Sequence, residues 1–141
     1  MTVASTSRLY ININALRQNF LNLSKLSSAK LIPVIKAEAY GLGAVGICQN
    51  LIDLVDEFFV YEIGEAIKLR KAVPKAKIFT FRPNLKTELS LYAEHRIIPS
   101  FSTLDELLNW FALFPDNNAV APYCLHFDTG LNRFGMREEA T

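Results

Sequence analysis

The sequence predicts an α/β fold in which short parallel strands alternate with helices. Apolar runs and amphipathic segments follow one another from Leu31 to Phe127, with a repeat of about twenty to twenty-five residues. The chain has 141 residues and half of them are hydrophobic, which is enough for a core and excludes intrinsic disorder. A closed eight-stranded barrel needs about 250 residues, so an incomplete parallel (β/α) barrel with about five of its eight strands is expected.

The amino-terminal segment predicts one strand and one helix of a different character. Apolar and polar residues alternate over Arg8–Ile13, which is typical of a strand. Asn14 is then expected to cap a helix over Ala15–Leu26, in which Phe20 and its neighbouring leucines recur at helical spacing.

Five further strands are predicted, each a short apolar run of the kind that a parallel sheet buries on both faces. In chain order they are Leu31–Lys36, Phe58–Tyr61, Ala76–Phe81, Arg96–Phe101 and Tyr123–Phe127. Pro33 conflicts with the first of them, because proline has no N–H to donate to a neighbouring strand. We expect the five strands to be parallel neighbours in chain order, with helices on the outer face and no internal domain boundary.

Four helices are predicted between these strands. Their apolar faces lie over Val45–Val55, Ile63–Arg70, Leu85–Tyr92 and Leu104–Phe111. The last helix begins at overlapping capping boxes in Ser102–Glu106, and a turn is expected at Asp116–Asn118.

Composition excludes several classes of function. Lys plus Arg number 15 and Asp plus Glu number 14, so the net charge of +1 lacks the basic footprint of a nucleic-acid binder. The apolar runs are too short to span a bilayer, and Met1–Tyr10 has no apolar core of a secretory signal. Cys48 and Cys124 do not form a disulfide framework, which favours the cytoplasm. No group of His, Cys, Asp and Glu has metal-ligand spacing, so no metal is expected.

The most informative segment is Val34–Gly43, in which a lysine ends a predicted strand. Ligands of parallel α/β proteins bind at the carboxyl ends of the strands, where Lys36 would be partly desolvated and able to form a Schiff base. Tyr40 offers a hydroxyl to a phosphate, and the N-terminal amides of a helix starting near Gly43 point the same way. The alternative is a solvent-facing lysine beside two turn glycines, and spacing alone favours that alternative.

A second segment, His126–Gly135, follows the last predicted strand. Its Asp-Thr-Gly triplet is also found in aspartic proteases, but those enzymes are all-β and the pattern here is βα. Asp128 is expected to accept hydrogen bonds from backbone amides of its own turn. Arg133 has a guanidinium suited to a carboxylate or phenolate, although an isolated arginine is more often a surface residue. His126 is expected either to point into the barrel mouth or to pack within the strand.

Three ordered motifs resemble the N-terminal part of the alanine racemase family. Residues 34–43, Val-Ile-Lys-Ala-Glu-Ala-Tyr-Gly-Leu-Gly, resemble the signature around the lysine that holds pyridoxal phosphate. Residues 128–135, Asp-Thr-Gly-Leu-Asn-Arg-Phe-Gly, resemble the family's second motif, and Tyr10–Leu16 resembles its first strand and helix. The resemblance covers essentially the whole chain.

The resemblance implies a function and an architecture. These racemases have a pyridoxal-phosphate barrel followed by a C-terminal β domain, and they act as homodimers that supply D-alanine for peptidoglycan. Residues 1–141 would be the N-terminal part of the barrel domain, without the β domain. Lys36 would hold the cofactor covalently and act as one of two bases that interconvert L-alanine and D-alanine. Tyr40 would help to hold the cofactor phosphate, and Arg133 would lie beside the cofactor's phenolic oxygen and the substrate carboxylate.

The sequence departs from the family pattern at three positions. The family usually has Asn where this chain has Glu38, and His where it has Leu42. Glu38 would bring a negative charge near the phosphate. Many members have a carbamylated lysine where this chain has His126, so Arg133 would need another partner.

Three other functions stay open at this point. They are a non-catalytic pyridoxal-phosphate-binding protein, a racemase of serine or ornithine, and a self-associating module without a ligand. The isolated chain is expected to be inactive, because racemisation needs a base on each face of the α-carbon and the chain supplies only Lys36.

Overall fold

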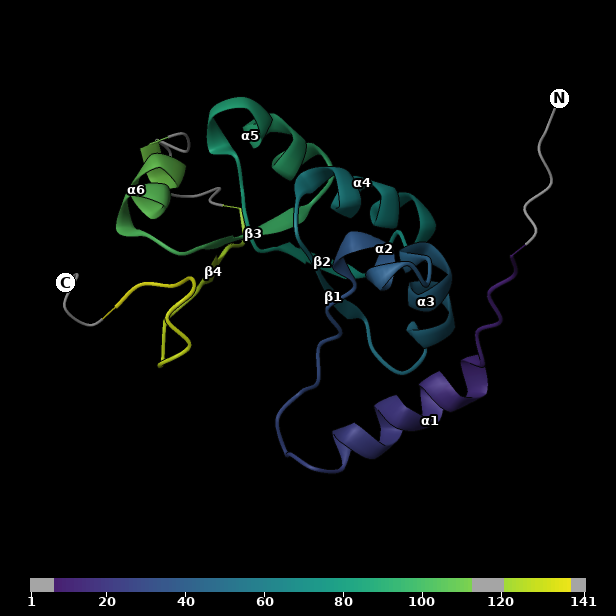
Figure 1. Ribbon diagram of the computed structural model, residues 1–141. Coiled ribbons are helices and arrows are strands. Elements are labelled where there is room, and N and C mark those ends of the chain that lie inside the picture. The colour runs from purple at the N-terminus through teal and green to yellow at the C-terminus, as the bar shows by residue number, and fades with distance from the viewer. Residues whose placement is uncertain (1–6, 113–120, 138–141) are drawn as a thin grey trace, which may run out of the picture. The chain divides into compact units, whose positions relative to one another are not determined.

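The computed structural model describes residues 7–112 and 121–137 (Figure 1). The turn expected at Asp116–Asn118 lies outside the described residues. The chain separates into two compact units, residues 1–31 and residues 32–141. No helix in the described part of the chain is long and apolar enough to cross a bilayer.

Over its described residues, the first unit contains one helix, α1 (Ile13–Ser24). Its N-cap is Asn12, whose side-chain oxygen accepts the N–H of Ala15 at 3.0 Å. The predicted helix is therefore confirmed, although it begins and ends two residues earlier than expected. The strand predicted over Arg8–Ile13 is wrong, because Asn12 caps the helix in place of Asn14 and the helix starts inside the predicted strand.

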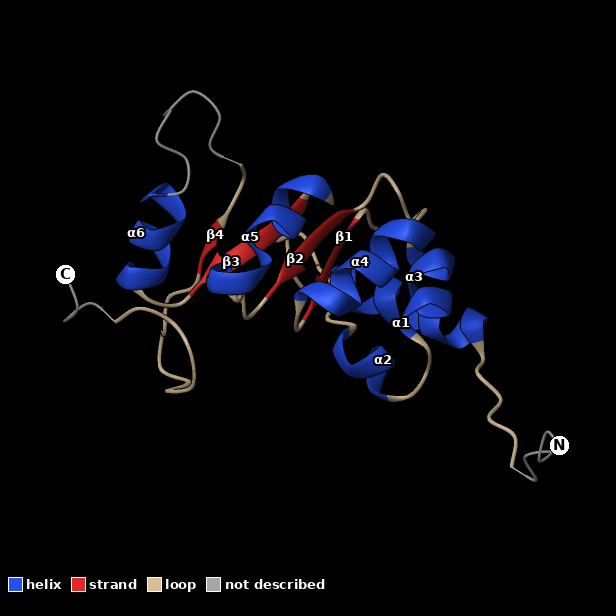
Figure 2. Cartoon of the chain, turned by 90° about the horizontal axis from the view of Figure 1, so that it is seen from above, coloured by secondary structure: helices blue, strands red, loops and turns tan. Residues whose placement is uncertain are grey.

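The second unit is built on a parallel sheet with the strand order β1-β2-β3-β4. The strands are β1 (Glu57–Val60), β2 (Lys77–Thr80), β3 (Ile97–Phe101) and β4 (Cys124–Leu125). Figure 2 shows them side by side, and every neighbouring pair is parallel. The predicted order of parallel neighbours along the chain is thus confirmed, and with it the α/β class and the incomplete barrel.

The strand predicted over Leu31–Lys36 is reduced to one parallel bridge, between Val34 and Phe59. Two hydrogen bonds hold it, from the Ile35 N–H to the Phe59 carbonyl at 2.8 Å and from the Phe59 N–H to the Pro33 carbonyl at 2.9 Å. Pro33 supplies an acceptor but has no N–H, so pairing cannot extend through it in both directions. This short extended segment ends at Ile35, and Lys36 follows at the carboxyl edge of the sheet.

The helices predicted between the strands are all present. They are α3 (Ala44–Leu51), α4 (Ile63–Ala72), α5 (Leu85–Glu94) and α6 (Leu104–Ala112). Helices α4 and α5 cover one face of the sheet (Figures 1 and 2). The capping box of α6 is confirmed, since the Thr103 hydroxyl accepts the Glu106 N–H at 3.2 Å and the Glu106 carboxylate accepts the Thr103 N–H at 3.2 Å.

The core lies between the sheet and these helices. Tyr92 and Trp110 are almost fully buried in it, with their rings edge to face at 6.3 Å. The Tyr92 hydroxyl lies 3.1 Å from the Thr80 hydroxyl, and burial raises the pKa of Tyr92 to about 12. On the opposite face of the sheet, Phe79 and Phe81 each stack on Phe59, with ring centroids 4.9 and 4.6 Å apart.

One arginine fastens the end of α4 to the amino ends of two strands. Arg70 donates to the carbonyls of His95 at 2.9 Å, Pro74 at 3.0 Å and Arg96 at 2.7 Å, and also to that of Ala76. Burial, with a smaller contribution from Arg96, lowers the pKa of Arg70. Arg70 is therefore a structural residue at the end of the sheet opposite Lys36.

Candidate functional site

The chain leaves the sheet at Lys36 through a turn of left-handed backbone. Helix α2 (Lys36–Tyr40) contains four consecutive residues other than glycine, residues 37–40, with φ between 52° and 55°. Each such residue costs roughly 1–2 kcal/mol relative to right-handed backbone. Strained segments of this kind persist only where the surrounding structure holds them, and they are concentrated at functional sites.

A glutamate of α4 contacts this turn directly. One carboxylate oxygen of Glu65 accepts the N–H of Ala37 at 2.6 Å, and the other accepts the N–H of Tyr61 at 2.8 Å. Glu65 thus joins the residue after Lys36 to the residue after β1. This role of Glu65 could not be predicted from the sequence, because an acidic residue in the first turn of a helix is common and its partner Ala37 lies 28 residues away.

A second carboxylate holds the turn from within. Glu38 pairs with Lys68 of α4, and its other oxygen accepts the N–H of Ala44 at 3.2 Å. The hydrogen bond from Lys68 and then that from Ala44 hold the pKa of Glu38 below its usual value. The negative charge expected here is therefore balanced by a cation. The first amide of α3, expected to face a phosphate, instead donates to Glu38.

The structure brings Lys36 and Tyr40 together. The Lys36 ammonium nitrogen lies 6.0 Å from the centre of the Tyr40 ring, at the outer range of a cation–π contact. Lys36 is half-buried, whereas Tyr40 is 74% exposed and can present its hydroxyl to a ligand. An amine and a phenol thus share one turn at the carboxyl edge of the sheet.

The second predicted motif forms a separate loop after β4. Asp128 accepts the N–H groups of Gly130 at 3.1 Å and Asn132 at 2.9 Å, which confirms the expected turn role. Its side chain is 4% exposed and lies 3.5 Å from the Arg137 guanidinium. The Asn132 amide, then that of Gly130, holds the pKa of Asp128 below its usual value.

Arg133 is exposed on this loop and lies apart from the lysine turn. No hydrogen bond or ion pair joins it to Lys36 or Tyr40 within the described ranges. No hydrogen bond or ion pair joins His126 to Arg133 in the described residues. The backbone N–H of His126 donates to the Phe101 carbonyl at 2.8 Å, and the centre of the His126 ring lies 6.5 Å from that of Phe81.

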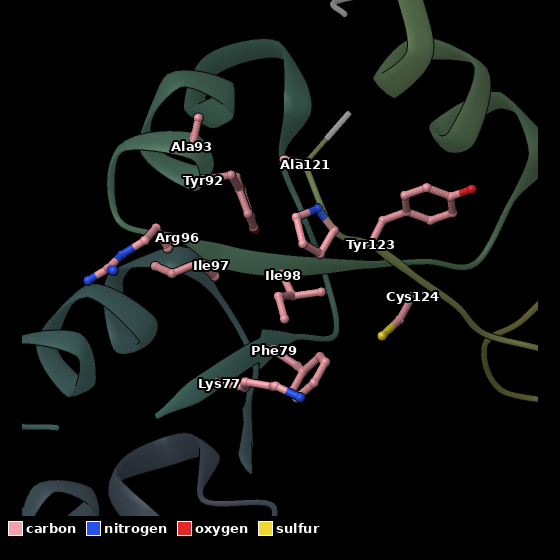
Figure 3. Close-up of a pocket in the computed structure, with 11 residues that line it drawn as sticks. Lys77, Phe79, Tyr92, Ala93, Arg96, Ile97, Ile98, Ala121, Tyr123 and Cys124 are labelled. Atoms are coloured by element: carbon pink, nitrogen blue, oxygen red, sulfur yellow. The ribbon is translucent and has the colours of Figure 1, made fainter. Parts of the chain in front are cut away.

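Two pockets lie near opposite ends of the strands. A polar one of about 560 Å³ is found beside the carboxyl ends of β1 and β2, and there Arg82 donates to the Tyr61 hydroxyl at 3.3 Å. An apolar one of similar volume lies around the amino end of β3, with Ile98 and Tyr123 among its lining residues (Figure 3). Burial, with a smaller contribution from Glu57, raises the pKa of the Cys124 thiol in the apolar pocket. This shift disfavours the reactive thiolate form of Cys124.

Comparison with known proteins now assigns the family. A family model for the N-terminal domain of alanine racemase matches residues 11–141. This chain belongs to the alanine racemase family.

Individual racemases agree with this assignment. The alanine racemase of Aquifex aeolicus is 34% identical over 133 residues, which are 93% of this chain and 38% of that protein. The alanine racemase of Ruegeria sp. is 32% identical over 134 residues, again 38% of its length. The crystal structure of alanine racemase from Bartonella henselae with covalently bound pyridoxal phosphate has a TM-score of 0.81 and 27% identity over 92% of this chain and 37% of that one. This chain thus spans well under half the length of these racemases.

The groups around Lys36 fit the cofactor of that racemase structure, an aldehyde that carries a phosphate. Lys36 supplies a primary amine, and the exposed hydroxyl of Tyr40 can donate to a phosphate oxygen. Gly41 and Gly43 leave open space, since no atom lies within 4 Å of where a side chain would begin. The neighbouring carboxylate of Glu38 is already paired, so it does not leave an uncompensated negative charge there.

Proposed function

We propose that this chain supplies the lysine side of a pyridoxal-phosphate-dependent alanine racemase, which interconverts L-alanine and D-alanine. One observation carries the proposal. In a chain that matches the racemase family over residues 11–141, Lys36 and Tyr40 share a strained, braced turn at the carboxyl edge of a parallel sheet. That edge is where parallel α/β proteins bind their ligands.

The residues of this chain would have distinct roles. Bound pyridoxal phosphate supplies an electron sink that makes the α-proton of the amino acid acidic. Lys36 holds the cofactor and moves that proton to or from one face of the α-carbon. Tyr40 donates its hydroxyl to the phosphate, and Arg133 binds a carboxylate or phenolic oxygen through its planar guanidinium.

The proposal extends to partner and compartment. A second base is needed on the opposite face of the α-carbon, and we place it on another part of a homodimeric enzyme. Cys48 and Cys124 are both free thiols in the described structure, which supports a reducing cytoplasm. The D-alanine formed would serve peptidoglycan synthesis.

Chemical trapping tests the role of Lys36. The chain is incubated with pyridoxal phosphate, reduced with borohydride and mapped by peptide mass spectrometry. The label is expected on Lys36, and a Lys36→Arg variant should lose it. Tyr40→Phe should retain the label but need a severalfold higher cofactor concentration, since it lacks one hydrogen bond to the phosphate. A label confined to other lysines would refute the assignment.

Turnover distinguishes the proposed enzyme from its alternatives. The 141 residues alone are expected not to form D-alanine faster than free pyridoxal phosphate does, because loss of one positioned acid–base group costs roughly 10²–10⁴ in rate. Joined to the remaining length of a related racemase, they should turn over alanine. Faster turnover of serine or ornithine than of alanine would contradict the proposed substrate. Cofactor binding without racemisation of any amino acid would contradict the enzymatic role.

A further inference from the structure

We propose that Glu65 is a positioning residue for Lys36, and that it acts by fixing the backbone immediately after the lysine. The inference rests on the proposed function, in which Lys36 is the reactive amine. No hydrogen bond or ion pair joins Glu65 to the Lys36 amine in the described structure; its two oxygens are engaged by the backbone amides of Ala37 and Tyr61.

The contact is specific to a carboxylate. Both oxygens of Glu65 accept hydrogen bonds, at 2.6 Å from Ala37 and at 2.8 Å from Tyr61. An ionised carboxylate has only acceptor sites, so it can serve two amides at once. A glutamine can accept from one amide only, and its NH₂ group would face the other N–H. Glu65→Gln therefore keeps at most one of the two bonds and sets a donor against the other N–H, while almost preserving side-chain volume.

The position of the contact explains why it matters for Lys36. Ala37 is the first residue of the left-handed stretch and has φ 52°, a value that alanine rarely adopts. The backbone before Lys36 is held by the pairing of Ile35 with Phe59. Glu65 holds the backbone after it, and so both sides of the lysine are tied to the β1 segment. Without Glu65 the turn is free to relax, and the Lys36 side chain loses its fixed direction.

A purely structural role predicts a different result. Glu65 also lies in the first turn of α4, where a negative charge stabilises a helix. If that were its whole contribution, its loss would lower the melting temperature and leave the relative reactivity of Lys36 unchanged. Glu62→Gln is the matched control, because Glu62 is the exposed N-cap residue of the same helix and makes no side-chain capping bond.

The first test measures the bonds themselves. Amide hydrogen exchange is followed by NMR in the wild-type chain and in Glu65→Gln, Glu65→Asp and Glu62→Gln. Exchange should accelerate about tenfold or more in Glu65→Gln at Ala37, at Tyr61 or at both, since at least one bond to a charged acceptor is lost. Glu65→Asp retains the charge on a shorter side chain, and its exchange rates should lie between those of the wild type and Glu65→Gln. If Glu65→Gln does not fold, Glu65→Asp is measured in its place. Unchanged exchange at both amides would overturn the proposal.

The second test measures the lysine in two ways. The first is trace acetylation with acetic anhydride in the absence of cofactor, with the label on Lys36 expressed relative to the label on Lys71. This ratio should be about threefold higher in Glu65→Gln than in the wild type, because the Lys36 side chain is less confined. Borohydride trapping with pyridoxal phosphate should show about tenfold less label on Lys36, because small displacements of a reacting group are costly. Glu62→Gln should match the wild type in both assays.

The outcomes separate this inference from the proposed function. If the wild-type chain incorporates no cofactor at Lys36, the proposed function fails, while acetylation still reports whether Glu65 positions the lysine. If the wild type is labelled and Glu65→Gln is labelled equally in both assays, the positioning role is refuted and the proposed function stands.

Discussion

Replacing Gly135 by alanine should open the loop that carries Arg133. A Cβ atom at Gly135 would lie 2.5 Å from the Asp128 amide nitrogen and 2.7 Å from the Phe127 carbonyl carbon. Both neighbours are backbone atoms, so no side chain can rotate away to make room. The two backbone segments that meet there, at Phe127–Asp128 and at Gly135–Met136, must separate instead.

The magnitude follows from the bonds that the separation breaks. The Asp128 N–H donates to the Met136 carbonyl at 2.9 Å, and the Met136 N–H donates to the His126 carbonyl at 2.8 Å. Each such bond contributes about 1 kcal/mol. The φ of Gly135, +114°, adds roughly 1–3 kcal/mol when the residue is alanine. Local opening should therefore become easier by about 3–5 kcal/mol, which is at least a hundredfold in the opening equilibrium.

Hydrogen exchange at the Asp128 and Met136 amides measures this opening, and Gly130→Ala is the control. Gly130 has a similar φ of +126°, but no atom lies within 4 Å of its Cβ position. The control therefore has the backbone strain without the collision, and it should accelerate exchange much less. Equal acceleration in the two variants would show that close approach of the backbone is not the reason for glycine at position 135.

Three further perturbations have defined outcomes. Arg70→Ala should lower the free energy of unfolding in urea by about 2–4 kcal/mol, because four carbonyls, two of them in part-buried bonds, lose their donor. Lys71→Ala should change it by less than about 0.5 kcal/mol. Glu38→Asn should free Lys68 to bind an anion, and so tighten pyridoxal phosphate binding about threefold to tenfold in a titration at low salt. Weaker binding would contradict the expectation that Glu38 keeps Lys68 from the cofactor. The pKa of Asp128 is lower in the folded chain than its ordinary value of 3.8, so its contribution to the loop should be complete above that value and lost as the pH falls through the lower folded-state pKa. The measurement is amide exchange in the loop against pH, relative to the intrinsic exchange rate at each pH, and in an Asp128→Asn variant this ratio should not change with pH.

The parallel order of the sheet was predictable because it depends on a repeated pattern. Apolar runs and helical faces recur along the whole second unit, and one misplaced boundary does not alter the topology. The amino-terminal strand was mispredicted because two asparagines, Asn12 and Asn14, each suit an N-cap, and alternation favoured the later one. The choice depended on a single side-chain hydrogen bond, from the Ala15 N–H to Asn12.

The site was predictable only in part. The motif around Lys36 and Tyr40 could be recognised because the family resemblance and the position at the end of a predicted strand both indicate a ligand site there. The left-handed backbone after Lys36 was not, since Ala37 and Ala39 favour right-handed helix and only tertiary contacts override that preference. The hydrogen bonds of Glu65 could not be predicted, because its partners are the backbone amides of Ala37 and Tyr61, and the type of a residue does not indicate what its backbone amide bonds to.

The order of the strands has a consequence for how the chain is built. Val34 pairs with Phe59, Glu57 with Lys77, Ile78 with Ile97 and Ser100 with Cys124, so every strand joins the one synthesised just before it. Each junction closes a loop of similar, modest length and needs nothing that is made later. On a translating ribosome the sheet can therefore grow one βα unit at a time. The turn at Lys36 would be assembled as soon as α4, with Glu65, has left the exit tunnel.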